Sequence, residues 1–224
     1  MKKSKICKFI ALLMVIFIVT LQGCSWKAKP EKSAQELIDE GNLEYDKGNY
    51  QKAVEAFEKL KDWYPFSKYA ITAELKTADS YYQLKEYDQA AMSYEEFETL
   101  HPSNEVIPYI VYQLGRCYFD RIDTIDRDQT NSKKALQTFN RLVRQFPDNQ
   151  YSILAKPHIN KCRKSLAEHE FYVGKFYYKS KKYKAALYRF KGLISNYPDV
   201  GVNKKAIDYI KLCEDKVKES KIEN

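Results

Sequence analysis

Glycine and proline are scarce in this sequence. Each occurs only seven times in 224 residues, whereas the two together usually make up about 12% of a protein. An all-β protein needs more turn residues than this, so the composition argues against that class. Histidine occurs three times, and no glycine-rich phosphate loop, nucleophile elbow or paired-acid motif is present. The chain therefore lacks the residue patterns of the common enzyme classes.

The few histidines do not form a metal site. His169-Glu170 begins like the zinc-binding H-E-x-x-H motif, but Val173 stands where the second histidine is required. His158 and His169 would share a helix face, yet their spacing along a helix puts them about 16 Å apart, too far to hold one ion. We predict no enzyme activity, no metal and no cofactor. We expect these two histidines and His101 to form hydrogen bonds at the surface or between repeats.

The amino-terminal segment has the pattern of a secretory signal peptide, which we assign to residues 1–23. Four lysines precede a thirteen-residue apolar run from Phe9 to Leu21, and a membrane-spanning helix needs roughly 20 such residues. The formal net charge of +8 depends on this segment, because the remaining chain has 34 Lys and Arg against 30 Asp and Glu. This balance does not support nucleic-acid binding. The four lysines are Lys2, Lys3, Lys5 and Lys8.

The signal ends in Leu21-Gln22-Gly23-Cys24, which resembles the lipobox of bacterial lipoproteins. In those proteins the chain is cut before the cysteine, which then carries several acyl chains and forms a firm membrane anchor. An aspartate in place of Ser25 would have indicated retention in the inner membrane, so the resemblance implies an outer-membrane anchor through Cys24. Residues 24–32 are predicted to tether the lipid to the folded domain. The alternative is that Cys24 is a buried core thiol.

Three cysteines remain besides Cys7 of the signal and Cys24, namely Cys117, Cys162 and Cys213. An odd number in an oxidising compartment leaves at least one free thiol. We expect each to be a small buried residue on a helix, although the sequence alone also allows one disulfide.

Four segments of the chain are similar to one another, and each ends in a proline. In each, an alanine precedes an aromatic residue by four positions, and a small residue stands further upstream. The pattern resembles the tetratricopeptide repeat, a unit of about 34 residues. The prolines are Pro65, Pro102, Pro147 and Pro198; the alanine and aromatic pairs are Ala53 and Phe57, Ala90 and Tyr94, Ala135 and Phe139, Ala186 and Phe190; the small residues are Gly41, Ala78, Gly115 and Gly174.

These repeats predict an all-α tetratricopeptide-repeat solenoid of antiparallel helix pairs, about four and a half repeats over residues 33–219, followed by a disordered tail at 220–224. Small residues let paired helices approach closely, and the proline ends the second helix because it lacks an N–H and clashes with the preceding turn. The predicted helices are 34–47, 51–63, 68–84, 88–100, 105–120, 132–145, 151–179, 184–195 and 203–219.

Two repeats depart from the regular spacing, because the intervals between successive prolines are 37, 45 and 51 residues. We place the additional residues of the third repeat in a charged loop, 121–131, and those of the fourth in a first helix of almost eight turns. Pro157 is expected either to kink this long helix or to mark its true start.

Five short phrases connect the chain to a known family: 64–67 (YPFS), 127–129 (RDQ), 162–163 (CR), 166–170 (LAEHE) and 173–177 (VGKFY). They resemble BamD, the tetratricopeptide lipoproteins of the outer-membrane β-barrel assembly machinery, over residues 33–213. The resemblance implies a long loop in the third repeat and an elongated helix in the fourth. It also implies a scaffold that binds unfolded outer-membrane proteins and the POTRA region of a BamA-like barrel protein. The family commonly has five full repeats, and residues 203–219 correspond to the first helix of the fifth.

The first helix of each repeat offers a candidate peptide-binding face, where a polar residue is followed three positions later by an aromatic ring that the repeat motif does not require. Rigid amphipathic rings suit an extended, aromatic-rich peptide. Alternatively, they only pack against the neighbouring first helix. The recurring residues are Asn42, Asp79, Arg116 and Lys175 with Tyr45, Tyr82, Phe119 and Tyr178. The resemblance implies that the first repeats bind the last strand of barrel proteins, with Tyr45, Tyr64, Phe66 and Tyr82 as contacts.

A second candidate site centres on Arg189, because the residues equivalent to it in the other repeats are Ala56, Ser93 and Thr138. A long cation is costly to bury without a partner, so we expect the stack to open there and to face an acidic surface. The resemblance places this arginine opposite the last POTRA domain. Alternatively, its stem covers the final helix and its head reaches water. The predicted partner contacts are Arg189, Lys175 and Arg116, with Lys179, Lys181, Lys182 and Lys184 adding basic surface.

Two other envelope functions use the same fold. A pilotin-like lipoprotein that escorts a secretin would need a hydrophobic groove for a partner helix. A cell-envelope coordinator usually carries a trimerising coiled coil before its repeats, and no heptad pattern precedes Ser33.

The lipobox predicts the fate of a Cys24→Ala variant. Because the sulfur is the acylation site, the variant should stay uncleaved or become soluble, and metabolic labelling with palmitate should disappear. Persistent label in the variant would show that the anchor lies elsewhere.

Overall fold

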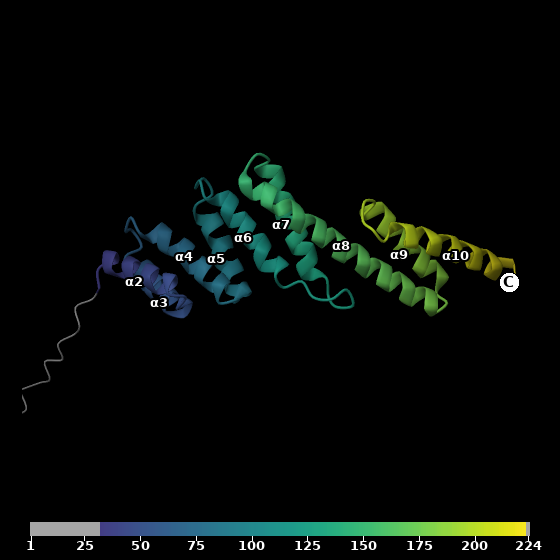
Figure 1. The fold of residues 1–224 in the computed structure, drawn as a ribbon, viewed down its shortest axis with the longest axis horizontal. Helices are drawn as coiled ribbons and strands as arrows, with labels where there is room; N and C mark the ends of the chain where they lie inside the picture. The colour runs from purple at the N-terminus through teal and green to yellow at the C-terminus, as the bar shows by residue number, and fades with distance from the viewer. Residues whose placement is uncertain (1–31, 223–224) are drawn as a thin grey trace, which may run out of the picture. The chain divides into compact units, whose positions relative to one another are not determined.

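The computed structural model describes residues 32–222. The predicted signal peptide, Cys24 and the tether before Lys32 lie outside the described residues. Every regular element from residue 32 to 222 is an α-helix, and each helix packs against the next along the chain (Figure 1). The helices are α2 (Ala34–Asp46), α3 (Tyr50–Trp63), α4 (Ala70–Gln83), α5 (Tyr87–Leu100), α6 (Ile107–Phe119), α7 (Thr130–Gln145), α8 (Gln150–Lys179), α9 (Tyr183–Asn196) and α10 (Asn203–Ile222).

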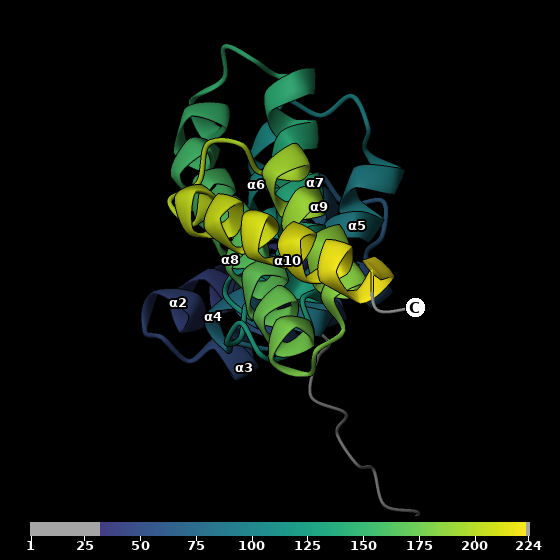
Figure 2. The same cartoon turned by 90° about the vertical axis from the view of Figure 1, so that its right-hand side faces the viewer.

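This arrangement confirms the predicted all-α tetratricopeptide-repeat solenoid. Helices α2 to α9 form four antiparallel pairs, and α10 packs on α9 and on the second half of α8 (Figure 2). The predicted tail was placed too early, because α10 continues through residues 220–222. No glycine or proline follows Gly201, so the sequence contains no residue that would end the helix sooner.

Each repeat proline ends the second helix of its pair two residues before the proline itself. The residue between them has a dihedral φ between −135° and −129° and a ψ between 53° and 62°. This conformation lies outside the helical region, as expected for a residue whose backbone would clash with the following proline ring. The four residues are Tyr64, His101, Phe146 and Tyr197.

Glycines of the first helix allow close approach of the second helix in three repeats. A β-carbon built on Gly115 would lie 2.5 Å from Cε1 of Phe139, a distance that no side chain can occupy without movement of its neighbours. The second repeat uses Ala78 and Tyr94, and both are completely buried. The equivalent distances for Gly41 to Phe57 and for Gly174 to Phe190 are 2.2 Å and 2.6 Å.

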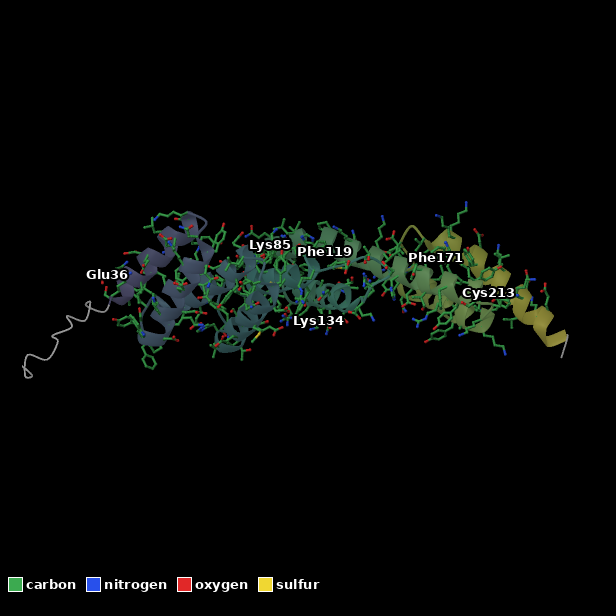
Figure 3. All side chains as sticks on the ribbon, turned by 90° about the horizontal axis from the view of Figure 1, so that it is seen from below. Glu36, Lys85, Phe119, Lys134, Phe171 and Cys213 are labelled. Atoms are coloured by element: carbon green, nitrogen blue, oxygen red, sulfur yellow. The ribbon has the colours of Figure 1, made fainter. Side chains whose placement is uncertain are left out.

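Helix α8 extends from one hydrophobic cluster into the next. Its first half packs on α6 and α7, whereas its second half pairs with α9 and α10. Figure 3 labels Phe119 and Phe171, which pack against these two clusters respectively. The helix begins after Asn149, whose side chain accepts a hydrogen bond from the backbone N–H of Tyr151. Pro157 therefore lies inside the helix and does not mark its start.

The additional residues of the third repeat form a loop, 120–129, which is fixed to α8. The Gln129 side chain is buried, and its nitrogen donates to two carbonyl oxygens of the loop at 3.0 and 3.1 Å. Its oxygen accepts a hydrogen bond from Ser165 at 3.3 Å. His169 Nδ1 lies 2.6 Å from the carbonyl oxygen of Ile125. The loop is thus held by polar contacts rather than by a helix of its own.

The cysteines Cys117, Cys162 and Cys213 are free thiols and all are buried. Burial raises the pKa of the Cys117 and Cys162 thiols to about 12. Because the thiolate is the reactive form, these two residues act as small core residues.

The contact between glycine and phenylalanine predicts a specific loss of stability. Gly115→Ala should lower the free energy of unfolding, because overpacking costs about 1–3 kcal/mol and exceeds the gain of up to about 1 kcal/mol in helix propensity. Phe139→Leu in the same chain should recover part of the loss, as measured by thermal unfolding.

Gly192→Ala in α9 is the control, because a β-carbon there meets no atom within 4 Å. This variant should be as stable as the native protein or more stable. If Gly115→Ala and Gly192→Ala raised stability equally, close helix approach would not be the role of Gly115.

Candidate functional site

A row of aromatic rings and cations connects the first helices of successive repeats. The Lys76 Nζ atom of α4 lies 4.5 Å from the centre of the Tyr45 ring of α2. The same arrangement places Arg116 of α6 at 5.7 Å from the ring of Tyr82. It recurs a third time with Lys161 of α8 at 5.1 Å from the Phe119 ring. We call these three pairs the aromatic ladder.

The ladder tyrosines also contact the tyrosine that opens the second helix of their own repeat. The ring centres of Tyr45 and Tyr50 are 5.2 Å apart, and those of Tyr82 and Tyr87 are 5.6 Å apart, both in edge-to-face geometry. The rings of Tyr45 and Tyr82 are half-buried. They therefore take part in packing within and between repeats, and the part of each ring that stays exposed is the surface open to a ligand.

The second rung of the ladder has a fixed polar environment. The Tyr82 hydroxyl donates to Asp120, and the Arg116 guanidinium donates to the same carboxylate at 3.0 Å. Burial, and then the hydrogen bond to Asp120, raise the pKa of Tyr82. The Arg116 guanidinium is therefore already paired with Asp120, although its side chain remains 30% exposed.

A buried carboxylate lies beside the ladder. Asp79 of α4 is 8% exposed, and its Oδ1 accepts hydrogen bonds from the hydroxyls of Tyr94 and Tyr109, each at 2.7 Å. Burial raises the pKa of this carboxyl, and the two hydrogen bonds oppose the rise. Asp79 thus joins α4, α5 and α6 and is not available to a partner.

The structure separates the four predicted peptide contacts into two places. Tyr45 and Tyr82 lie at the ladder, next to the start of the second helix. Tyr64 and Phe66 follow the far end of α3. Because α3 has 14 residues, this end lies about 20 Å from the ladder along the helix pair. Tyr64 is half-buried against the first cluster, whereas Phe66 is 100% exposed.

The Arg189 side chain of α9 reaches across to α8. Its Nη1 donates to the Glu170 carboxylate at 3.1 Å, and this hydrogen bond raises the pKa of the arginine. The side chain is 36% exposed. Sequence reasoning missed Glu170 as the partner, because 19 residues separate it from Arg189 and no local spacing connects them.

The three predicted partner contacts do not form one patch. Lys175 lies over the ring of Phe171 at 5.8 Å, and Phe171 in turn contacts Tyr209 of α10. Arg189 instead meets the side of α8 that carries Glu170. Arg116 belongs to the aromatic ladder on α6.

Two exposed aromatic residues lie on the helices that carry Glu170 and Arg189. Phe176 of α8 is 60% exposed and Tyr188 of α9 is 76% exposed. The Phe176 ring lies 5.8 Å from the ring of Tyr177, whose hydroxyl also interacts with Arg189. We call Glu170, Phe176, Tyr177, Tyr188 and Arg189 the Arg189 patch.

Hydrogen bonds at the surface or between repeats were expected for the histidines; the contact of His158 joins two repeats, whereas that of His101 lies within the second repeat. His101 Nε2 lies 2.6 Å from Glu74 of α4, and His158 Nε2 lies 3.2 Å from the hydroxyl of Tyr112 on α6. No three potential ligands converge on a metal position within residues 32–222. In the same part of the chain, none of the helices is both long and apolar enough to cross a membrane.

The stacked helix pairs and their proline-terminated second helices define a tetratricopeptide-repeat scaffold. Residues 30–222 match the model of the YfiO family, which is described as an outer membrane lipoprotein. The chain belongs to this family, the BamD family of outer membrane lipoproteins.

Three relatives carry the name outer membrane protein assembly factor BamD. The Caulobacter vibrioides protein is 28% identical over 194 residues, which cover 84% of this chain and 64% of the relative. The Neisseria gonorrhoeae protein is 29% identical, with 92% and 84% covered. The Rickettsia prowazekii protein is 31% identical, with 86% and 78% covered. The chain thus spans less than two thirds of the Caulobacter relative.

The buried Asp79 predicts opposite results for two substitutions. Asp79→Ala leaves two tyrosine hydroxyls without an acceptor and should cost about 2–4 kcal/mol of unfolding free energy. Asp79→Asn keeps an oxygen for both hydroxyls and removes a charge that is costly to bury, so it should be neutral or stabilising at pH 7.

The pH dependence gives a further check of Asp79. A raised pKa means that the folded state binds the proton of Asp79 more tightly than the unfolded state does. The stabilisation that comes from this protonation is complete below about pH 4 and is lost as pH rises through the raised pKa. The advantage of Asp79→Asn over the native protein should therefore shrink on acidification. A difference that stays constant from pH 3 to 7 in chemical denaturation would contradict a raised pKa.

Proposed function

We propose that this protein is an outer-membrane protein assembly factor that binds unfolded barrel proteins and a POTRA domain of a BamA-like barrel protein. In this proposal it acts as a scaffold without enzyme activity, and a lipid on Cys24 holds it at the periplasmic face of the outer membrane. Family membership and the names of the relatives support the assembly role. The observation that carries the proposal is the aromatic ladder, which repeats the same chemistry on three successive helix pairs.

The ladder has a spacing and a chemistry that suit an extended chain. Helices in contact lie about 10 Å apart, and an extended strand advances about 3.3 Å per residue, so the step from one rung to the next corresponds to about three residues of a bound peptide. The ring edges offer apolar contact to aromatic side chains. The adjacent cations Lys76 and Lys161 offer attraction to carboxylates, including a terminal one.

Tyr82 provides the test of peptide binding. Tyr82→Ala should weaken the affinity for a peptide from the last strand of a barrel protein by about fivefold, since a lost ring contact costs on the order of 1 kcal/mol. Tyr82→Phe keeps the ring beside Arg116 and should bind almost as the native protein does. Fluorescence titration well below the melting temperature measures both.

Tyr118→Ala is the matched control. Tyr118 is also half-buried, with Lys134 at 5.1 Å from its ring and a hydrogen bond to Glu95 at 3.0 Å, but it is not part of the ladder. This variant should keep the peptide affinity. Equal loss in the two alanine variants would mean that the effect comes from stability, and no loss in Tyr82→Ala would reject the ladder as the site.

The Arg189 patch is the proposed contact with the POTRA domain. It combines an arginine with exposed aromatic rings, which is the composition of energetically important interface residues. Glu170 holds the guanidinium in place at 3.1 Å, and more than a third of the arginine side chain remains accessible. A carboxylate of the partner can therefore share the cation without displacing Glu170.

Exchanging the two charges separates stability from binding. Arg189→Glu alone places two carboxylates together and should lower both the melting temperature and co-purification with the barrel protein. Arg189→Glu with Glu170→Arg restores an ion pair, so the melting temperature should recover. Co-purification from detergent-solubilised envelopes should stay lost, because the exposed charge that the partner meets is reversed.

The same exchange at Arg141 and Glu98 is the control, since this pair also connects two helices and is similarly exposed. It should leave the complex intact. If the Arg189 and Glu170 exchange restored co-purification as well, the arginine would serve stability alone. A secretin in the purified complex instead of a barrel protein would favour the pilotin-like function.

A further inference from the structure

Positive charge is concentrated in the pair formed by the end of α8 and by α9. Residues 171–198 contain six lysines and one arginine and no acidic residue. The rest of the chain after residue 23 then has 27 Lys and Arg against 30 Asp and Glu, given 34 and 30 in total. One end of the helix stack is thus strongly basic, whereas the remainder is slightly acidic.

Four of these lysines have no ion-pair partner among residues 32–222. Lys191 is paired with Glu214 at 2.8 Å, and Arg189 is paired with Glu170. Lys175 lies over the ring of Phe171. The remaining four are all exposed, and we call them the lysine tip: Lys179, Lys181, Lys182 and Lys184.

The lysine tip surrounds a shallow apolar depression. The chain reverses direction at Lys181, whose φ of 58° permits a turn of three residues between α8 and α9. Three of the lysines, together with Tyr183, Ala185 and Val217 of α10, line a depression of about 520 Å³. The tip therefore presents cations at its rim and apolar groups between them.

We infer that the lysine tip binds the anionic phospholipid headgroups of a membrane surface. Lysine ammonium groups on flexible stems act as point charges and lack the fixed fork with which arginine holds individual carboxylates. Such groups at the end of a helix pair suit a planar layer of phosphates, and the apolar depression can take up the boundary of the acyl chains. An acidic protein surface would instead favour arginines with fixed partners, as in the Arg189 patch.

The inference rests on the proposed function in one respect, namely that the protein is located at a membrane. With Cys24 anchored, the protein as a whole is held at the membrane, so a weak individual affinity of the tip is sufficient. Each lysine near an anionic surface contributes about a fivefold gain in partition. The two attachments together would fix which side of the repeat domain faces the periplasm.

Vesicle sedimentation tests the tip without the lipid anchor, using the chain from residue 25, which contains the whole helical unit that begins at Ala34. The protein should bind phosphatidylcholine vesicles that contain phosphatidylglycerol and should not bind phosphatidylcholine alone. High salt should release it, because screening removes the attraction. Changing the four tip lysines to glutamine should lower the partition by at least tenfold.

The control changes four other exposed lysines to glutamine, Lys52, Lys59, Lys68 and Lys85. This set is matched, because Lys85 has a φ of 62° and stands at a turn as Lys181 does. The control variant should bind as the native protein does. Equal loss in both variants, or equal binding to both vesicle types, would overturn the inference. The inference would also be overturned if the tip variant bound vesicles as the native protein does but no longer bound a protein partner. The tip would then dock on an acidic protein.

Discussion

The structure depends on a few close approaches between helices, where a phenylalanine ring of the second helix occupies the space that a glycine of the first helix leaves free. This contact occurs in three of the four repeats, with alanine and tyrosine in the other. It sets the distance between the helices of a pair and hence the position of the next pair. Because the ladder rings lie on the same first helices, their alignment with cations from the following repeat depends on this spacing.

Helix α8 changes the regular stacking where the two proposed contact regions meet. Its first half completes the packing of the third repeat, and its second half provides the surface on which α9 holds Arg189. The last pair of the ladder is Phe119 of α6 and Lys161, which lies on the first half of α8. One continuous helix therefore connects the proposed peptide-binding face with the proposed partner patch.

The repeat signature allowed the helices to be predicted well, because proline and the small residues act locally. Most predicted boundaries differ from the observed ones by one or two residues, and the long helix and the loop of the third repeat were both expected from the proline intervals. Which of the candidate site residues lie together could not be predicted in the same way. Whether Lys175 faces Arg189 depends on the rotation of α8, and the pairing of Arg189 with Glu170 depends on contacts between helices. Neither follows from local spacing.

The division of the core into three clusters has a consequence for how the protein unfolds. The first repeat buries a cluster around Phe57 together with Ala70 and Ala73 of α4, and this cluster is separate from the two that share α8. The stability of such a chain is close to the sum of the stabilities of its local units and their interfaces. One unit can therefore open and exchange its amide hydrogens while the amides of the other units stay protected. The first repeat is an end unit with one neighbour, and it can unfold and refold without disturbing α8 or the residues that α8 aligns.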